Sequence, residues 1–249
     1  MIENPMDMLR QELDQRAQAG RPAQLWLRDD DATLPTASLD RLLTLTGQFE
    51  VPLTLAVIPA DTGEALAERL DGEAQVEVAV HGWSHHNHAA DGEKSQELGA
   101  HRPATTVLAE LARGRERLAS LHGAHFIPML VPPWNRIANH VVAGLADIGY
   151  EALSVYGPEK PAPLPVLNTH VDIIDWRGTR GGRADDVLVA ELLTVLRSHD
   201  GPIGLLIHHL VHDEAAWGFM ARIFAATFAH KGCAWRSARD LLQIHGGRE

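Results

Sequence analysis

Short apolar segments alternate with longer segments of helical periodicity along most of the chain. Eight segments have the composition of strands: residues 25–28, 51–58, 76–80, 126–131, 152–155, 166–174, 203–207 and 233–235. Helical spacing of apolar residues is found in residues 38–49, 62–70, 104–121, 137–148, 184–199, 213–229 and 236–244. Most strand segments are apolar throughout, which is typical of strands buried on both faces of a parallel sheet. The pattern therefore predicts a parallel α/β fold, either a barrel or a doubly wound sheet.

The predicted elements follow one another without a linker, an internal repeat or a low-complexity tract. Two polar stretches, residues 82–102 and 175–185, have the length of functional loops. A chain of 249 residues suits one α/β domain, so we expect residues 1–249 to form a single domain. Residues 1–22 are expected to form an N-terminal amphipathic helix with Met6, Leu9 and Leu13 on one side.

Composition and charge exclude several classes of protein. The net charge of −11 argues against a nucleic-acid-binding protein, because such surfaces need clustered Lys and Arg. No apolar run approaches the ~18 residues of a membrane span. The single cysteine excludes an internal disulfide and a cysteine-based zinc site, and it agrees with a reducing compartment. The start of the chain lacks the apolar core of a signal peptide, so a cytoplasmic protein is expected. The oligomeric state is not indicated.

Residues capable of chemistry gather where five predicted strands end. They form the runs 28–31, 81–88, 132–136 and 172–177 and the pair His208 and His209. Histidine is the commonest metal ligand, and this chain contains 15 histidines but only 2 tyrosines. Sites of parallel α/β folds form at the carboxyl ends of the strands. These runs are therefore the candidates for a functional site.

The aspartates and histidines in these runs suggest a metal centre. Asp29, Asp30 and Asp31 repel one another, which favours a bound cation unless the run is a solvated acidic loop. His81 and His85 are four residues apart and can converge on one ion. Two histidines and one carboxylate leave a coordination position open, as in catalytic zinc sites.

Other residues of the runs are open to two interpretations. His88 is a further candidate near the metal, whereas His86 suits the surface. Trp134 follows two prolines and either stacks on a sugar ring or packs in a turn. Asp175 and Trp176 pair an acid with an aromatic ring, or form a solvated loop with an anchoring tryptophan.

Two adjacent histidines follow the strand predicted at residues 203–207. His208 and His209 point to opposite faces if the strand continues, so one of them is expected to enter a site. Cys233 has no nearby base and is interpreted as a small core residue.

The order of these runs resembles the polysaccharide deacetylase family, carbohydrate esterase family four, whose members share the chitooligosaccharide deacetylase homology domain. Five motifs carry the resemblance: 28–32 (Arg-Asp-Asp-Asp-Ala), 81–85 (His-Gly-Trp-Ser-His), 131–135 (Val-Pro-Pro-Trp-Asn), 172–176 (Asp-Ile-Ile-Asp-Trp) and 206–208 (Leu-Ile-His). They lie within residues 24–210, and the extended runs 81–88 and 132–136 indicate a separate branch of the family.

The resemblance implies a distorted (β/α) barrel of seven or eight mostly parallel strands, with one divalent metal. Zn²⁺ is the first expectation, and Co²⁺, Ni²⁺ and Mn²⁺ are alternatives. Aligned on the family motifs, the metal ligands are Asp31, His81 and His85, the base is Asp30 and the general acid is His208. A one-residue shift would make Asp30 the ligand and Asp29 the base, and His209 is the alternative acid. Substrate contacts are expected from Trp134, Asn135, Arg136, Asp175, Trp176, His88 and His209.

The function implied by the resemblance is metal-dependent removal of an acetyl group from an N-acetylated sugar, a precursor of a cell-surface polysaccharide. Two alternatives remain open: hydrolysis of a non-sugar amide or cyclic imide, and a carbohydrate-binding module without catalysis. The sequence departs from the family where Val131 replaces an arginine, Ala32 a glycine and Asn135 a second glycine. Val131 favours the inactive module, whereas the retained aspartates and histidines oppose it.

Overall fold

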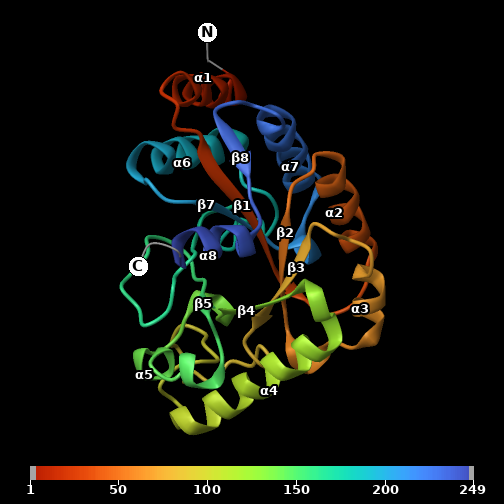
Figure 1. Ribbon diagram of the computed structural model, residues 1–249, viewed down its shortest axis with the longest axis vertical. Helices are drawn as coiled ribbons and strands as arrows, with labels where there is room; N and C mark the ends of the chain where they lie inside the picture. The colour runs from red at the N-terminus through yellow and green to blue at the C-terminus, as the bar shows by residue number, and fades with distance from the viewer. Residues whose placement is uncertain (1–3, 247–249) are drawn as a thin grey trace. The chain divides into compact units, whose positions relative to one another are not determined.

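The computed structural model describes residues 4–246, whose strands and helices alternate as predicted (Figure 1). The strands are β1 (Ala23–Ala32), β2 (Leu53–Val57), β3 (Val76–His81), β4 (Phe126–Val131), β5 (Ala152–Leu153), β6 (Thr169–Asp172), β7 (Ile203–Ile207) and β8 (Cys233–Trp235). The helices are α1 (Pro5–Gln18), α2 (Ala37–Gln48), α3 (Glu64–Leu70), α4 (Ala104–His122), α5 (Asn139–Val142), α6 (Asp185–Ser198), α7 (Glu214–Thr227) and α8 (Ala238–Gly246). Short 3-10 turns are η1 (Pro59–Asp61), η2 (Gly123–His125), η3 (Pro133–Asn135), η4 (Ala146–Ile148) and η5 (His209–Val211).

The strands form a sheet whose hydrogen-bonding order is β5-β4-β3-β2-β1-β7-β6, and β8 pairs with β1. The pairs β1–β7, β1–β8, β3–β4, β4–β5 and β6–β7 are all parallel. Parallel neighbours require crossover connections, and helices occupy most of these connections. The predicted parallel α/β class is therefore confirmed.

Contacts between residues divide the chain into two compact units. The first contains residues up to 29, 36–53 and 169–237, and the second contains 30–35, 54–168 and those after 237. The expectation that residues 1–249 form a single domain stays a prediction.

In the first unit, α1 covers α6 and α7 with the predicted apolar stripe. Met6, Leu9 and Leu13 are buried, which confirms the amphipathic helix within residues 4–22; residues 1–3 of the predicted segment lie outside the described residues. Glu12 lies at the edge of the stripe and accepts a hydrogen bond from Arg197 of α6, with 2.8 Å between Nε and Oε2.

In the second unit, α4 packs against β3 and β4. Every residue of β3 is buried, including His81 at its end, and His81 is in register with Val131 at the end of β4. The apolar core thus fixes the strand that carries the first predicted histidine ligand.

One predicted helix is wrong. Residues 137–148 form the single turn α5 and the 3-10 turn η4 instead of a continuous helix. Adjacent β-branched Val141 and Val142 and then Gly144 have low helix propensity, and the side chain before α5 makes no cap hydrogen bond.

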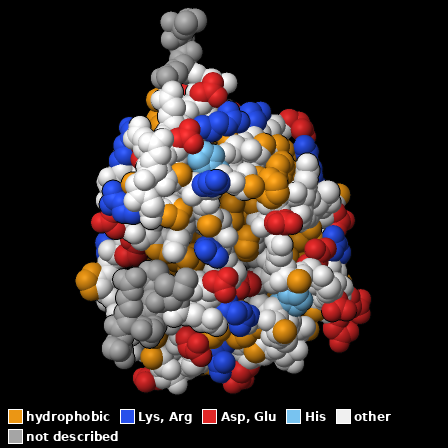
Figure 2. Space-filling view, turned by 45° about the horizontal axis from the view of Figure 1, so that its top comes forward, with side chains coloured by type: hydrophobic (Ala, Val, Ile, Leu, Met, Phe, Trp, Pro, Cys, Tyr) orange, Lys and Arg blue, Asp and Glu red, His pale blue; other side chains and the backbone are white. Residues whose placement is uncertain are grey.

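None of the helices in residues 4–246 is long and apolar enough to cross a bilayer. On the face shown in Figure 2, acidic and basic side chains are interspersed with apolar ones.

Candidate functional site

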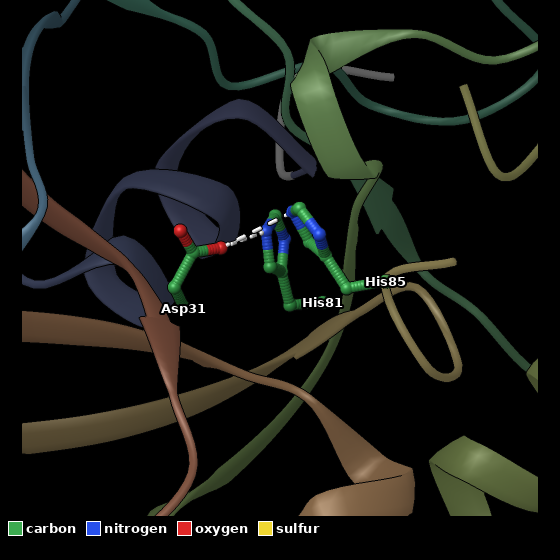
Figure 3. Close-up of side chains that lie close together, drawn as sticks. All are labelled: Asp31, His81 and His85. Atoms are coloured by element: carbon green, nitrogen blue, oxygen red, sulfur yellow. Dashed lines mark hydrogen bonds and ion pairs between the residues drawn. The ribbon is translucent and has the colours of Figure 1, made fainter. Parts of the chain in front are cut away.

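Asp31, His81 and His85 lie together in the second unit, with the Asp31 carboxylate directed at the two imidazole rings (Figure 3). Asp31 Oδ1 is 3.0 Å from His81 Nε2 and 3.3 Å from His85 Nε2. The side chain of His81 is only 2% exposed, whereas those of Asp31 and His85 are 32% and 24% exposed. Two imidazole nitrogens and one carboxylate oxygen are ligands that zinc prefers, and the exposed side leaves room for a further ligand.

Strand ends position His81 for this arrangement. The His81 ring bonds the Val131 carbonyl through Nδ1 at 3.0 Å. Because a carbonyl oxygen can only accept, the Nδ1–H group of His81 is the donor in this bond. The lone pair of a neutral ring is then on Nε2, the nitrogen that faces Asp31. Such a bond on the other ring nitrogen is the usual support of a metal-binding histidine.

The backbone at the site is strained. Asp31, His85, Trp134 and Asn135 have positive φ angles of 73°, 56°, 55° and 56°. Residues other than glycine rarely adopt this conformation, and where they do, they cluster at functional sites. Trp134 has this left-handed conformation, and the centroid of its ring lies 4.2 Å from the centroid of the His85 ring.

Burial controls the charge of His85. The pKa of His85 is lowered, first because burial disfavours the charged ring and second because His81 is close. The neutral ring is therefore favoured near neutral pH, and this is the form that binds a metal.

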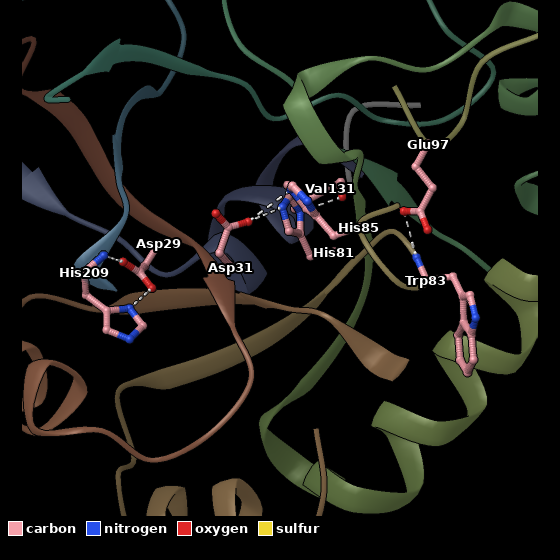
Figure 4. A network of polar contacts seen from close by, with 8 residues as sticks. All are labelled: Asp29, Asp31, His81, Trp83, His85, Glu97, Val131 and His209. Atoms are coloured by element: carbon pink, nitrogen blue, oxygen red, sulfur yellow. Dashed lines mark hydrogen bonds and ion pairs between the residues drawn. The ribbon is translucent and has the colours of Figure 1, made fainter. Parts of the chain in front are cut away.

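A buried carboxylate that the sequence analysis missed supports the loop between the two histidines. Glu97 accepts a hydrogen bond from the backbone N–H group of Trp83 at 3.1 Å (Figure 4). It accepts a second one from the backbone N–H group of Ser84 at 2.8 Å. Glu97 lies in the polar stretch 82–102, where neither periodicity nor a motif distinguishes it from the other acidic residues of the stretch.

In the first unit, Asp29 and His209 form a buried pair (Figure 4). His209 Nδ1 is 2.6 Å from Asp29 Oδ2, and the His209 N–H donates to Oδ1 at 2.7 Å. Both side chains are fully buried. The sequence singled out both residues, Asp29 as an alternative base and His209 as a substrate contact or alternative acid. It did not indicate that they bond to each other.

We expect Asp29→Ala to lower the free energy of unfolding by about 3–5 kcal/mol, because it leaves the His209 ring and N–H buried without their partner. Asp29→Asn is expected to cost less, since the amide oxygen still accepts a hydrogen bond. Denaturant unfolding in the presence of a chelator measures both variants without a contribution from metal. An alanine variant as stable as the wild type would contradict the importance of this pair.

His208 and Trp176 lie together in the first unit. Their rings meet edge to face with centroids 4.6 Å apart. Trp176 Nε1 donates to Asp172 Oδ2 at 2.8 Å, and the Ile174 N–H donates to Oδ1 of the same carboxylate. Asp172 therefore orients the indole ring of Trp176, a residue that is 40% exposed.

The side chains of Asp175 and Arg136 form hydrogen bonds with backbone groups of loops. Asp175 accepts hydrogen bonds from the N–H groups of Gly178 and Thr179, and it thereby shapes its loop. Arg136 donates to the Ser95 carbonyl at 2.6 Å. Their predicted contacts with substrate stay predictions.

Two further predicted substrate contacts lie in the second unit. The His88 N–H donates to the Gln96 carbonyl at 3.0 Å. Desolvation, followed by the charge of Arg102, lowers the pKa of His88. Asn135 lies in η3 beside Trp134. Roles in substrate binding remain predictions for these residues as well.

The chain belongs to the polysaccharide deacetylase family, because the family model of that name matches residues 19–153, more than half of the sequence. Membership places it among hydrolases that act on acetylated sugars. No curated protein matches it significantly.

Solved structures share its fold. A Mycobacterium smegmatis protein provisionally named a polysaccharide deacetylase has a TM-score of 0.69 at 17% identity, with 90% of each chain covered. A family 4 acetyl xylan esterase from Clostridium thermocellum, in complex with a cobalt ion, has a TM-score of 0.58 at 15% identity, covering 90% of this chain and 92% of that one. A family 4 carbohydrate esterase from Streptomyces lividans, in complex with acetate, has a TM-score of 0.59 at 17% identity, covering 85% and 91%. The likeness confirms the predicted distorted (β/α) barrel fold.

Proposed function

We propose that this protein is a metal-dependent hydrolase that removes the acetyl group from an N-acetylated sugar, a precursor of a cell-surface polysaccharide. The observation that carries the proposal is the convergence of Asp31, His81 and His85 in a member of this family. The three ligand atoms lie within 4.8 Å of one another, and their types suit Zn²⁺ as well as Co²⁺, Ni²⁺ or Mn²⁺. The cobalt ion in the Clostridium thermocellum relative supports a divalent metal here.

A divalent ion held by Asp31, His81 and His85 would supply a Lewis acid that polarises the acetamide carbonyl and lowers the pKa of water. Asp30, which is 2% exposed, takes the proton of the attacking water. A backbone N–H near Trp134 donates to the developing oxyanion. His208 protonates the departing amine nitrogen, so that the products are acetate and the free amino sugar. The roles of Asp30 and His208 rest on the order of the family motifs.

Two aromatic side chains support a sugar as the substrate. The Trp134 ring lies against the His85 ring, and the partly exposed residue Trp176 donates a hydrogen bond to Asp172. Exposed indole faces bind the apolar faces of sugar rings, and their polar surroundings supply hydrogen bonds to hydroxyl groups.

We expect the zinc-loaded protein to release acetate from short oligomers of N-acetylglucosamine. Chelation should abolish release and added zinc should restore it, because the attacking water and the carbonyl both depend on the ion. Enzymatic measurement of acetate checks this, with a parallel panel of cyclic imides and non-sugar acetamides. Hydrolysis of that panel alone would assign the alternative amide substrate.

The catalytically inactive binding module is favoured by one observation. Val131 stands where the family has an arginine, and its side chain is buried and apolar. One zinc per chain, with binding of the oligomers but no hydrolysis of any amide, would establish that alternative.

A further inference from the structure

The two histidine ligands of the proposed metal centre are joined by a loop that lacks regular secondary structure. Residues 82–85 belong to no helix or strand, and Gly82 and His85 have φ angles of 61° and 56°. Such a loop does not satisfy its own N–H groups in a ladder, so groups from elsewhere must fix its conformation.

The carboxylate of Glu97 binds this loop at adjacent backbone positions. Oε2 accepts the Trp83 N–H at 3.1 Å, while Oε1 accepts the Ser84 N–H at 2.8 Å and the Ser84 hydroxyl at 3.1 Å. Glu97 is 1% exposed, so these bonds compete little with water. Hydrogen bonds to a buried carboxylate are roughly twice as strong as neutral ones.

The neighbouring chain is shaped to hold this carboxylate. A Cβ atom at Gly82 would overlap Glu97 Oε2 and the Pro133 ring, so only glycine fits at that position. The backbone around Glu97 is itself fixed, because Arg102 donates to the Glu97 carbonyl and the Ala138 N–H donates to the Leu98 carbonyl. Glu97 is therefore held in place independently of the loop that it binds.

We infer that Glu97 is a positioning residue of the metal centre, which holds residues 83 and 84 so that His81 and His85 present their Nε2 atoms to one ion. This role rests on the proposed function, because it requires a metal at Asp31, His81 and His85. Figure 4 shows Glu97 bonded to the loop on the side of Trp83, while the two histidines face Asp31. Glu97 thus acts through the backbone and without contact to the ion.

The test is the zinc affinity of the metal-free protein, measured by competition with a chromogenic chelator. Glu97→Gln puts an amide NH₂ against one backbone donor, and we expect zinc to bind about 10–100-fold more weakly, as is typical when a supporting group of a metal ligand is lost. Ser84→Ala removes only the hydroxyl bond and should give a smaller loss. Glu93→Gln is the matched control: it makes the same change in the same stretch, but Glu93 bonds His101. Its affinity should equal that of the wild type.

Unfolding in the presence of a chelator separates positioning from a merely structural role. Weakened zinc affinity in a folded Glu97→Gln protein supports the inference, whereas unchanged affinity with a lowered unfolding midpoint overturns it. If Glu97→Gln does not fold, Ser84→Ala decides: weaker zinc binding supports the role and wild-type binding overturns it. A wild-type protein that binds no stoichiometric zinc would instead overturn the metal centre, and with it the role of Glu97.

Discussion

Replacing Asp31 with alanine is expected to remove both the bound metal and all measurable release of acetate. Asp31 Oδ1 lies 3.0 and 3.3 Å from the two histidine nitrogens, so it is the carboxylate among the described residues that completes this three-ligand set. Without it, two imidazoles remain, and neither supplies the negative charge that offsets a divalent ion. Metal analysis of the purified protein and an acetate assay measure the two effects.

A matched pair of controls makes this result interpretable. Asp91→Ala removes a carboxylate from an exposed position in the loop that follows the histidines, and it should retain one metal per chain and full turnover. The double variant His81→Ala/His85→Ala should resemble Asp31→Ala in both measurements. An Asp31→Ala protein that retains metal at full occupancy would contradict the assignment of Asp31 and transfer the ligand role to the alternative, Asp30.

The strands and the convergence of Asp31, His81 and His85 were accessible to sequence reasoning because both leave local patterns. Apolar runs bounded by polar residues predicted all eight strands, and the spacing of His81 and His85 predicted their convergence. The choice between Asp30 and Asp31 was not accessible. Asp31 has a positive φ angle, and aspartate adopts this conformation more often than most residues do, but three consecutive aspartates do not indicate which of them adopts it.

The missed contacts join residues that no local pattern links. Asp29 bonds His209 across 180 positions, and Glu97 reaches Trp83 from a polar loop without periodicity. Pairing of β1 with β7 is what brings Asp29 to His209, and strand order is not contained in any local pattern. The bond from Arg136 to the Ser95 carbonyl was missed as well, because no local pattern links these two residues.

Replacing His208 with alanine is expected to leave the metal bound and to lower turnover of N-acetylated sugars by about 10²–10⁴-fold. His208 is not among the ligand atoms that converge on Asp31, so metal content should not change. Its proposed task is to protonate an amine, a leaving group too basic to depart as an anion. The loss should therefore appear in kcat, and the exposed His140→Ala variant should show none.

Comparing substrates with different leaving groups tests whether His208 is a general acid. An activated aryl acetate releases a phenolate that needs no proton, so the His208→Ala variant should hydrolyse it nearly as well as the wild type does. A general acid is thereby distinguished from a residue that holds the fold or the metal, since loss of either would reduce both activities equally. Equal loss on the two substrates would contradict the general-acid role. Undiminished turnover of the N-acetylated sugar would transfer that role to His209, whose Nδ1 is already oriented by Asp29.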